Sequence, residues 1–131
     1  MSQQNVEVVR RVHDHFNRTG EPDFNLLDPD VVLDTSKAVF VRGLFRGHDG
    51  FREWLATQRD MWTSQRLEPE ELIPAGDDRV IACLRVVAVG RDGIETIAHF
   101  ASLTTLHSGR VTYVKVFLTK AEALEAAGIR G

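Results

Sequence analysis

The sequence predicts a single α+β domain, and three observations point to it. Its 131 residues suit one domain and leave little room for a second. Apolar residues recur at helical spacing in the first half, whereas the period changes toward two from about residue 67. Helices followed by strands with short turns between them are typical of an antiparallel sheet that carries helices.

Composition excludes several classes of protein. Hydrophobic residues make up 43% and charged residues 27%, an ordinary globular balance. The net charge is −3 without a basic run, which argues against nucleic-acid binding. No apolar stretch approaches the roughly 20 residues of a membrane span. Cys83 is the only cysteine, so neither an internal disulfide nor a cysteine metal cluster can form. The first five residues do not resemble a signal peptide, and we expect a cytoplasmic protein.

Helices are predicted first along the chain. In residues 4–18, Val9, Val12 and Phe16 recur at helical spacing, and Gly20 and Pro22 end the helix. Further elements are predicted at 23–27 (a short helix), 31–33 (a short strand), 35–47 (an extended segment or hairpin arm) and 48–63 (the clearest helix).

Strands fill most of the second half. Turn-forming sequences separate four segments of period two, and Gly128 ends a terminal helix. The predicted strands are 66–74, 80–89, 94–106 and 111–118, and the helix is 120–127. We expect an antiparallel meander with one face covered by three amphipathic helices.

Several segments, in their order and spacing, carry a resemblance to a known family. They are Asn17, 27–34 (LDPDVVLD), 45–54 (FRGHDGFREW), 76–80 (GDDRV), 108–111 (SGRV) and 119–128 (TKAEALEAAG). Together they resemble the SnoaL-like family of the nuclear-transport-factor-2-like superfamily. The resemblance implies a cone in which a curled antiparallel sheet packs on three to four helices and encloses an apolar pocket. It also implies a homodimer formed through the outer face of the sheet.

Asp34 is the first candidate catalytic residue. It follows three apolar residues, which predicts a strand end that faces inward or lies at the rim. Its position resembles that of the general-base aspartate of ketosteroid isomerase, and an apolar pocket raises a carboxyl pKa and makes a better base. The alternative is a turn aspartate, since Asp34-Thr35-Ser36 is a good turn sequence.

His99 and His13 are the candidates for an acid or an oxyanion donor. His99 lies mid-strand on the face shared with Ala101 and Leu103, and a core or interface histidine is the alternative. His13 flanks the apolar stripe of the first helix. The two oxyanion donors of ketosteroid isomerase fall near Ala101 and Val12, so both are missing, which argues against steroid isomerisation.

Arg85 interrupts an otherwise apolar strand. A buried arginine needs a partner, which is either Glu95 on the next strand or a carboxylate of a ligand. On the last strand, Val114 and Val116 alternate with Lys115, and we expect the aliphatic face to be the pocket side.

Aromatic side chains supply a wall for a flat, hydrophobic ligand, although a plain core is the alternative. Trp54 and Trp62 are eight residues apart on the predicted helix 48–63 and therefore near one face. The candidate ligand-binding residues are Phe16, Phe40, Phe51, Trp54, Trp62, Arg85 and Phe100.

Phosphate loops, nucleophile motifs and metal-binding histidine spacings are absent from the sequence, so we expect no cofactor and no metal. The first hypothesis is a cofactor-independent enzyme that transfers a proton in a small hydrophobic carbonyl compound, as isomerases and cyclases do. Asp34 would be the base, with His99 or His13 as the acid. The alternatives are a non-catalytic module that binds a lipophilic molecule and a dimeric interaction domain with a filled core.

Overall fold

The helices of the computed structural model, which describes residues 2–38 and 41–129, lie close to their predicted positions. They are α1 (Ser2–Thr19), the 3-10 helix η1 (Phe24–Leu26), α2 (Gly47–Met61) and α3 (Lys120–Ala126). α2 ends two residues earlier than predicted, so Trp62 begins the next strand instead of lying on the helix. None of the described helices combines the length and apolar character that a membrane crossing needs.

One curled sheet contains the described strands in the order β2-β1-β6-β5-β4-β3. The predicted meander is confirmed, because β3 to β6 pair successively and antiparallel. The strands are β1 (Leu27–Asp34), β2 (Leu44–Arg46), β3 (Trp62–Ala75), β4 (Arg79–Gly90), β5 (Glu95–His107) and β6 (Arg110–Phe117).

The sheet is mixed, which corrects the prediction of a purely antiparallel one. β1 pairs in parallel with β6, whereas β2 pairs antiparallel with the other edge of β1. The predicted hairpin arm at 35–47 therefore includes a short strand. Parallel strands need a long connection between them. Here α2 and the first three strands of the meander lie between β1 and β6 along the chain. The α+β class is confirmed.

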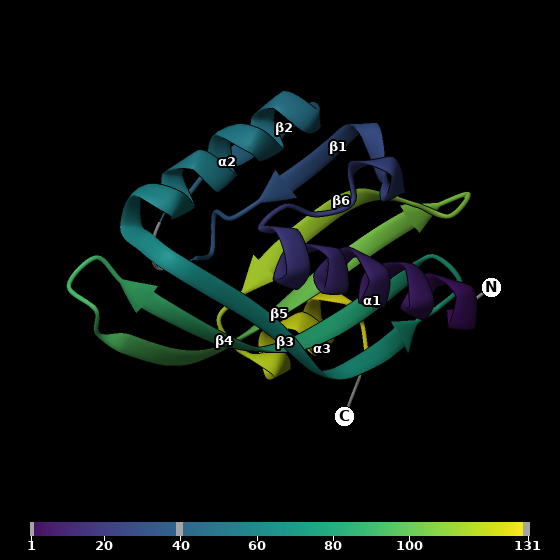
Figure 1. The fold of residues 1–131 in the computed structure, drawn as a ribbon. Helices are drawn as coiled ribbons and strands as arrows, with labels where there is room; N and C mark the ends of the chain where they lie inside the picture. Colours follow the sequence, from purple (N-terminus) through teal and green to yellow (C-terminus); the bar gives the residue numbers. More distant parts are fainter. Residues whose placement is uncertain (1, 39–40, 130–131) are drawn as a thin grey trace.

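Helices cover both faces of the curled sheet, and not one face as predicted. α1 and α2 lie against the concave face, which receives alternate residues of β4 such as Val80, Ala82 and Leu84 (Figure 1). α3 lies on the convex face, where Ala123 packs among Ile81 and other apolar side chains. A sequence with apolar residues on both faces of β4 and β5 needs this second cover. The homodimer through the convex face stays a prediction.

Asn17 fastens α1 to the edge strand β3. Its side-chain amide donates to the carbonyl oxygen of Leu67 at 2.8 Å, and its side-chain oxygen accepts from the Leu67 amide at 2.8 Å. The side chain thus pairs with one residue of β3 as a neighbouring strand would. This explains why a polar residue occupies the inner side of an amphipathic helix.

We predict that Asn17→Ala lowers the free energy of unfolding by about 1–3 kcal/mol, because both backbone groups of Leu67 lose a partly buried partner. Urea denaturation followed by circular dichroism measures the loss. Asn25→Ala is the matched control, since Asn25 is exposed, and we expect a change within about 0.5 kcal/mol. Equal stability of the two variants would contradict this role.

Candidate functional site

A cavity of about 110 Å³ lies between α1, α2 and the concave face of the sheet, and we name it the helix cavity. Its wall is mostly aliphatic and aromatic. Its lining side chains include His13, Phe16, Phe51, Trp54, Ser102 and Thr104.

A second cavity of about 190 Å³, the strand cavity, lies between the C-terminal half of α2 and strands β3 to β6. Trp54, Leu67, Leu84 and Val116 line both cavities, so the two adjoin each other. The polar side chains of the strand cavity are Thr35, Gln58, Gln65 and Thr96. The interior thus contains two adjoining chambers.

His13 is the one ionisable side chain among the described residues that line the two cavities. Its Nδ1 lies 2.8 Å from the carbonyl oxygen of Val9, one helical turn earlier. A carbonyl oxygen only accepts, so Nδ1 carries the proton and Nε2 keeps its lone pair. Burial lowers the pKa of His13, although the hydrogen bond to Val9 opposes this shift in part. The cavity therefore contains a neutral imidazole with a fixed tautomer.

Asp34 lies on the convex side, so its predicted placement in the pocket is wrong. Its neighbour Leu33 lines the helix cavity, and side chains alternate along β1. Asp34 is paired with Lys115 in the parallel register, and the lysine Nζ lies 3.9 Å from Asp34 Oδ2. The turn interpretation describes it better, since Asp34 Oδ1 accepts from the amide of Ser36 at 2.9 Å and from its hydroxyl at 2.6 Å.

The Tyr113 hydroxyl donates to Asp34 Oδ2 at 2.7 Å and completes this cluster. Burial by itself raises the pKa of Asp34, but the hydrogen bonds from Ser36 and Tyr113 and the charge of Lys115 outweigh it and hold the pKa below its ordinary value. Burial and the neighbouring carboxylate raise the pKa of Tyr113 to about 12. A carboxylate stabilised in this way joins β1 to β6 and is a poor general base.

His99 and Arg85 also lie on the convex face, which corrects their predicted place in the pocket. The two residues are opposite each other in β5 and β4. The His99 side chain is 65% exposed, with Nε2 3.4 Å from a carboxylate oxygen of Glu70. Arg85 forms its ion pair with Glu68, its direct partner on β3, and not with Glu95, which is paired with Val89.

The predicted aromatic residues divide between the cavities. Phe16 and Phe51 line the helix cavity, Trp62 and Phe100 line the strand cavity, and Trp54 lies between them. Phe51 and Trp54 pack edge to face, with ring centroids 6.0 Å apart. Phe40 lies outside the described residues.

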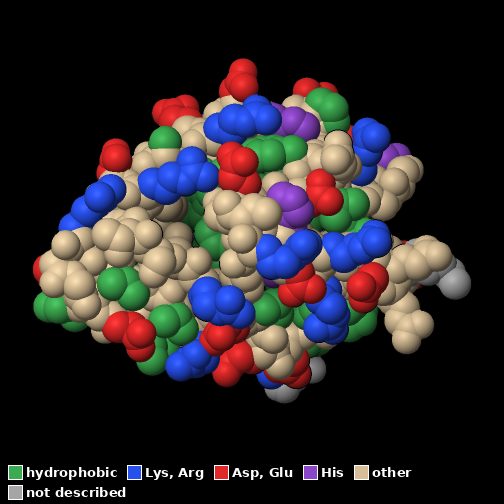
Figure 2. All heavy atoms as spheres, viewed as in Figure 1, with side chains coloured by type: hydrophobic (Ala, Val, Ile, Leu, Met, Phe, Trp, Pro, Cys, Tyr) green, Lys and Arg blue, Asp and Glu red, His purple; other side chains and the backbone are tan. Residues whose placement is uncertain are grey.

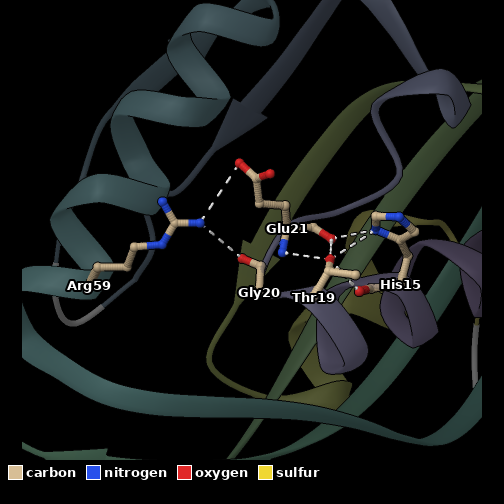
Figure 3. Close-up of polar contacts among 5 residues, drawn as sticks. All are labelled: His15, Thr19, Gly20, Glu21 and Arg59. Atoms are coloured by element: carbon tan, nitrogen blue, oxygen red, sulfur yellow. Dashed lines mark hydrogen bonds and ion pairs between the residues drawn. The ribbon is translucent and has the colours of Figure 1, made fainter.

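An edge pocket of about 130 Å³ adjoins both cavities at the end of α1. It shares Phe16 and Leu55 with the helix cavity and Gln58, Trp62 and Gln65 with the strand cavity. Arg59 of α2 reaches across this region to the carbonyl oxygen of Gly20 at 3.3 Å and to the carboxylate of Glu21 at 3.8 Å (Figure 3).

The last turn of α1 holds the loop at this edge in place. His15 Nδ1 donates to the carbonyl oxygen of Glu21 at 2.7 Å, and the Thr19 hydroxyl accepts from the Glu21 amide at 3.2 Å (Figure 3).

On the surface, charges of both signs are interspersed, and one recess exposes hydrophobic side chains (Figure 2). Among the described residues, no cluster of His, Cys, Asp and Glu side chains is arranged to hold a metal ion.

Several solved structures are similar to this chain over nearly its whole length. TerC, co-crystallised with polyporic acid, has a TM-score of 0.79 at 23% identity, over 95% of this chain and 98% of that chain. An NTF2-like protein of unknown function from Burkholderia pseudomallei has a TM-score of 0.76 at 20% identity, over 93% and 95%. A protein from Jannaschia sp. CCS1, provisionally described as a SnoaL-like polyketide cyclase, has a TM-score of 0.72 at 19% identity, over 96% and 92%.

This chain has the nuclear-transport-factor-2-like fold. A protein from Catenulispora acidiphila described as having a ketosteroid isomerase-like fold is also similar, with a TM-score of 0.72. These likenesses agree with the resemblance of the sequence to SnoaL-like proteins. No family model and no curated protein matches the sequence. These similarities show the fold, which by itself does not determine a function.

Sequence reasoning missed Ser102 and Thr104, which line the helix cavity of this NTF2-like fold. The predicted offset pointed to Ala101, but that residue faces α3 on the convex side. The signal was present in the alternation along β5, where Phe100, Ser102 and Thr104 share one face. His99 and Phe100 occupy opposite faces of this strand, so only one of them could face inward.

We predict that Tyr113, the only tyrosine of the chain, titrates with a pKa of about 12. Phenolate absorbance at 295 nm measures this value, read only while the far-ultraviolet circular dichroism stays native. In Asp34→Asn the pKa falls toward the ordinary value of about 10, because the negative charge is removed. The urea-unfolded chain gives the reference. A native pKa near 10 would contradict the Asp34–Tyr113 hydrogen bond.

We predict that His13 makes stability fall as the pH drops below about 6.5, the ordinary imidazole pKa. Because the folded pKa is lowered, the unfolded chain takes up the proton first, at up to about 1.4 kcal/mol per pH unit. Urea denaturation of wild type and His13→Leu between pH 7.5 and 5 isolates this contribution, since the variant loses that part of the slope. His107→Leu, at the exposed end of β5, should keep the wild-type slope.

Proposed function

We propose that the protein binds a small, flat, uncharged molecule in the helix and strand cavities. The observation that carries the proposal is the character of the lining. Aromatic and aliphatic side chains surround a single neutral imidazole, without a carboxylate, lysine or arginine among the described lining residues. A charged ligand group would lose its hydration there without gaining a counter-charge, which disfavours it.

Size limits the ligand further. An apolar cavity of about 150 Å³ is sufficient for a molecule such as benzene, and the two chambers measure about 110 and 190 Å³. A ligand that extends over both therefore has at most one ring in the helix cavity and one or two in the strand cavity. Trp54 between the chambers can stack on such rings.

His13 gives the ligand its orientation in the helix cavity. Because Nδ1 is occupied by Val9, the lone pair of Nε2 is the group that can accept a hydrogen bond from a ligand hydroxyl. The hydroxyl groups of Ser102 and Thr104 belong to the same cavity and can donate to a ligand carbonyl. Hydroxylated aromatic molecules and enols match this set.

A second candidate function is proton transfer, and the fixed tautomer of His13 favours it. A neutral imidazole in an apolar cavity can take a proton from an acidic C–H group beside a ligand carbonyl. Asp34 has no part in this version because it lies on the convex face. The similarity to SnoaL-like and ketosteroid isomerase-like structures supports this candidate as well as simple binding.

We predict that 2-naphthol quenches the fluorescence of Trp54 and Trp62 saturably and that His13→Leu weakens its binding about five- to tenfold, the usual effect of one lost hydrogen bond. Polyporic acid, with which TerC was crystallised, is the charged comparison, because its acidic enol groups ionise near neutral pH, and it should bind more weakly than 2-naphthol. His107→Leu is the matched control and should bind like wild type. Absence of saturable binding by 2-naphthol, or tighter binding of the anionic probe, would overturn the proposed function.

Hydrogen exchange in a bound ketone measures proton transfer separately from binding. In D2O, 2-tetralone should exchange its C1 protons faster with the protein than with buffer alone, as followed by proton NMR, and His13→Leu should remove this increase. Binding of 2-tetralone without faster exchange would leave a binding module and exclude the enzymatic candidate for this class of carbonyl compound.

A further inference from the structure

Gln58 and Gln65 form an amide pair in the otherwise apolar wall of the strand cavity. Gln58 lies near the end of α2, and Gln65 lies on β3. The side-chain nitrogen of Gln65 donates to the side-chain oxygen of Gln58 at 3.1 Å. Both side chains are half-buried, and both line the strand cavity and the edge pocket. The pair therefore lies where the interior meets the region bridged by Arg59 in Figure 3.

The contact between the two glutamines uses one N–H and one lone pair and leaves their other donors and acceptors available. An amide offers two N–H donors and an oxygen with two lone pairs. With one N–H of Gln65 bound to the oxygen of Gln58, the NH2 group of Gln58 and the oxygen of Gln65 remain as a donor and an acceptor. A planar ligand amide carries the complementary acceptor and donor side by side.

The surroundings make this pair selective. The side chains around it include Trp54, Trp62 and Phe100, and no described residue of the strand cavity is charged. The Thr35 hydroxyl, another polar group of the wall, already donates to the carbonyl oxygen of Val41 at 2.6 Å. In such a wall, unsatisfied polar atoms disfavour ligands that lack the matching groups.

We propose that Gln58 and Gln65 are specificity-determining residues that select an uncharged planar ligand with an acceptor and a donor side by side, as in a primary amide or a lactam. This inference rests on the proposed binding function and adds a second recognition point, separate from His13. The aromatic body of the ligand packs on Trp54, and its amide edge meets the glutamine pair.

Four naphthalenes of similar shape test the inference by tryptophan fluorescence: 2-naphthamide, 2-acetonaphthone, 2-ethylnaphthalene and 2-naphthoate. We expect 2-naphthamide to bind about tenfold more tightly than 2-ethylnaphthalene, 2-acetonaphthone to fall between them, and 2-naphthoate to bind most weakly. Gln65→Met should weaken 2-naphthamide about five- to tenfold and change 2-ethylnaphthalene by less than about twofold.

Two further variants separate recognition from a structural role. Gln58→Glu keeps the acceptor for Gln65 but loses the donor for the ligand, so at pH 7 it should also weaken 2-naphthamide and spare 2-ethylnaphthalene. Gln3→Met, at an exposed position of α1, should match wild type. Equal affinities of wild type for 2-naphthamide and 2-ethylnaphthalene, or equal losses for both in the variants, would overturn this inference alone. Absence of binding by every uncharged probe would overturn the proposed function as well.

Discussion

The parallel pairing of β1 with β6 closes the interior of this protein. The two strands join residues about eighty positions apart, Asp34 with Lys115 and Leu33 with Val114. Pairing over such a separation carries a large loop-closure cost, which the whole meander and its packing must offset. Because β2 pairs with β1 and leads into α2, this pairing also brings α2 across the concave face. Without it, the cavities would lose the wall that Phe51 and Trp54 provide.

The alternation of side chains along β1 decides on which face of the sheet the negative charge of Asp34 lies. Leu33 faces the helix cavity, whereas Asp34 faces the convex side and meets Tyr113 and Lys115. A one-residue shift of register would place the carboxylate inside and the leucine outside. The hydrogen bonds to Asp34 favour the observed register, since an aspartate inside the cavity would have no such partners. The same cluster that joins the strands therefore keeps the interior uncharged.

The sequence was sufficient to predict the elements, because their periods and turns are local properties. Faces were harder. For β6 the aliphatic side was correctly predicted to face inward, since Val114 and Val116 line the helix cavity. For β5 the prediction failed at His99, because Leu103 on the same face is buried by α3 and made that face look like the inner one. The face of β5 that lies inside is decided by the register that pairs Leu103 with Lys115. This register depends on long-range strand pairing, which a single sequence does not display.

The candidate site shows how a common fold acquires a particular chemistry through few residues. His13 and Asn17 are four positions apart on α1 and therefore on one side of the helix. Asn17 fixes that side to Leu67 of β3, and Leu67 itself lines both cavities. The two hydrogen bonds between Asn17 and Leu67 thus set the depth at which the imidazole enters the helix cavity, while the hydrogen bond to Val9 sets its tautomer. The position and the protonation of His13 are consequences of the packing of α1, so a change at the contact of Asn17 with β3 should alter the surroundings of the imidazole.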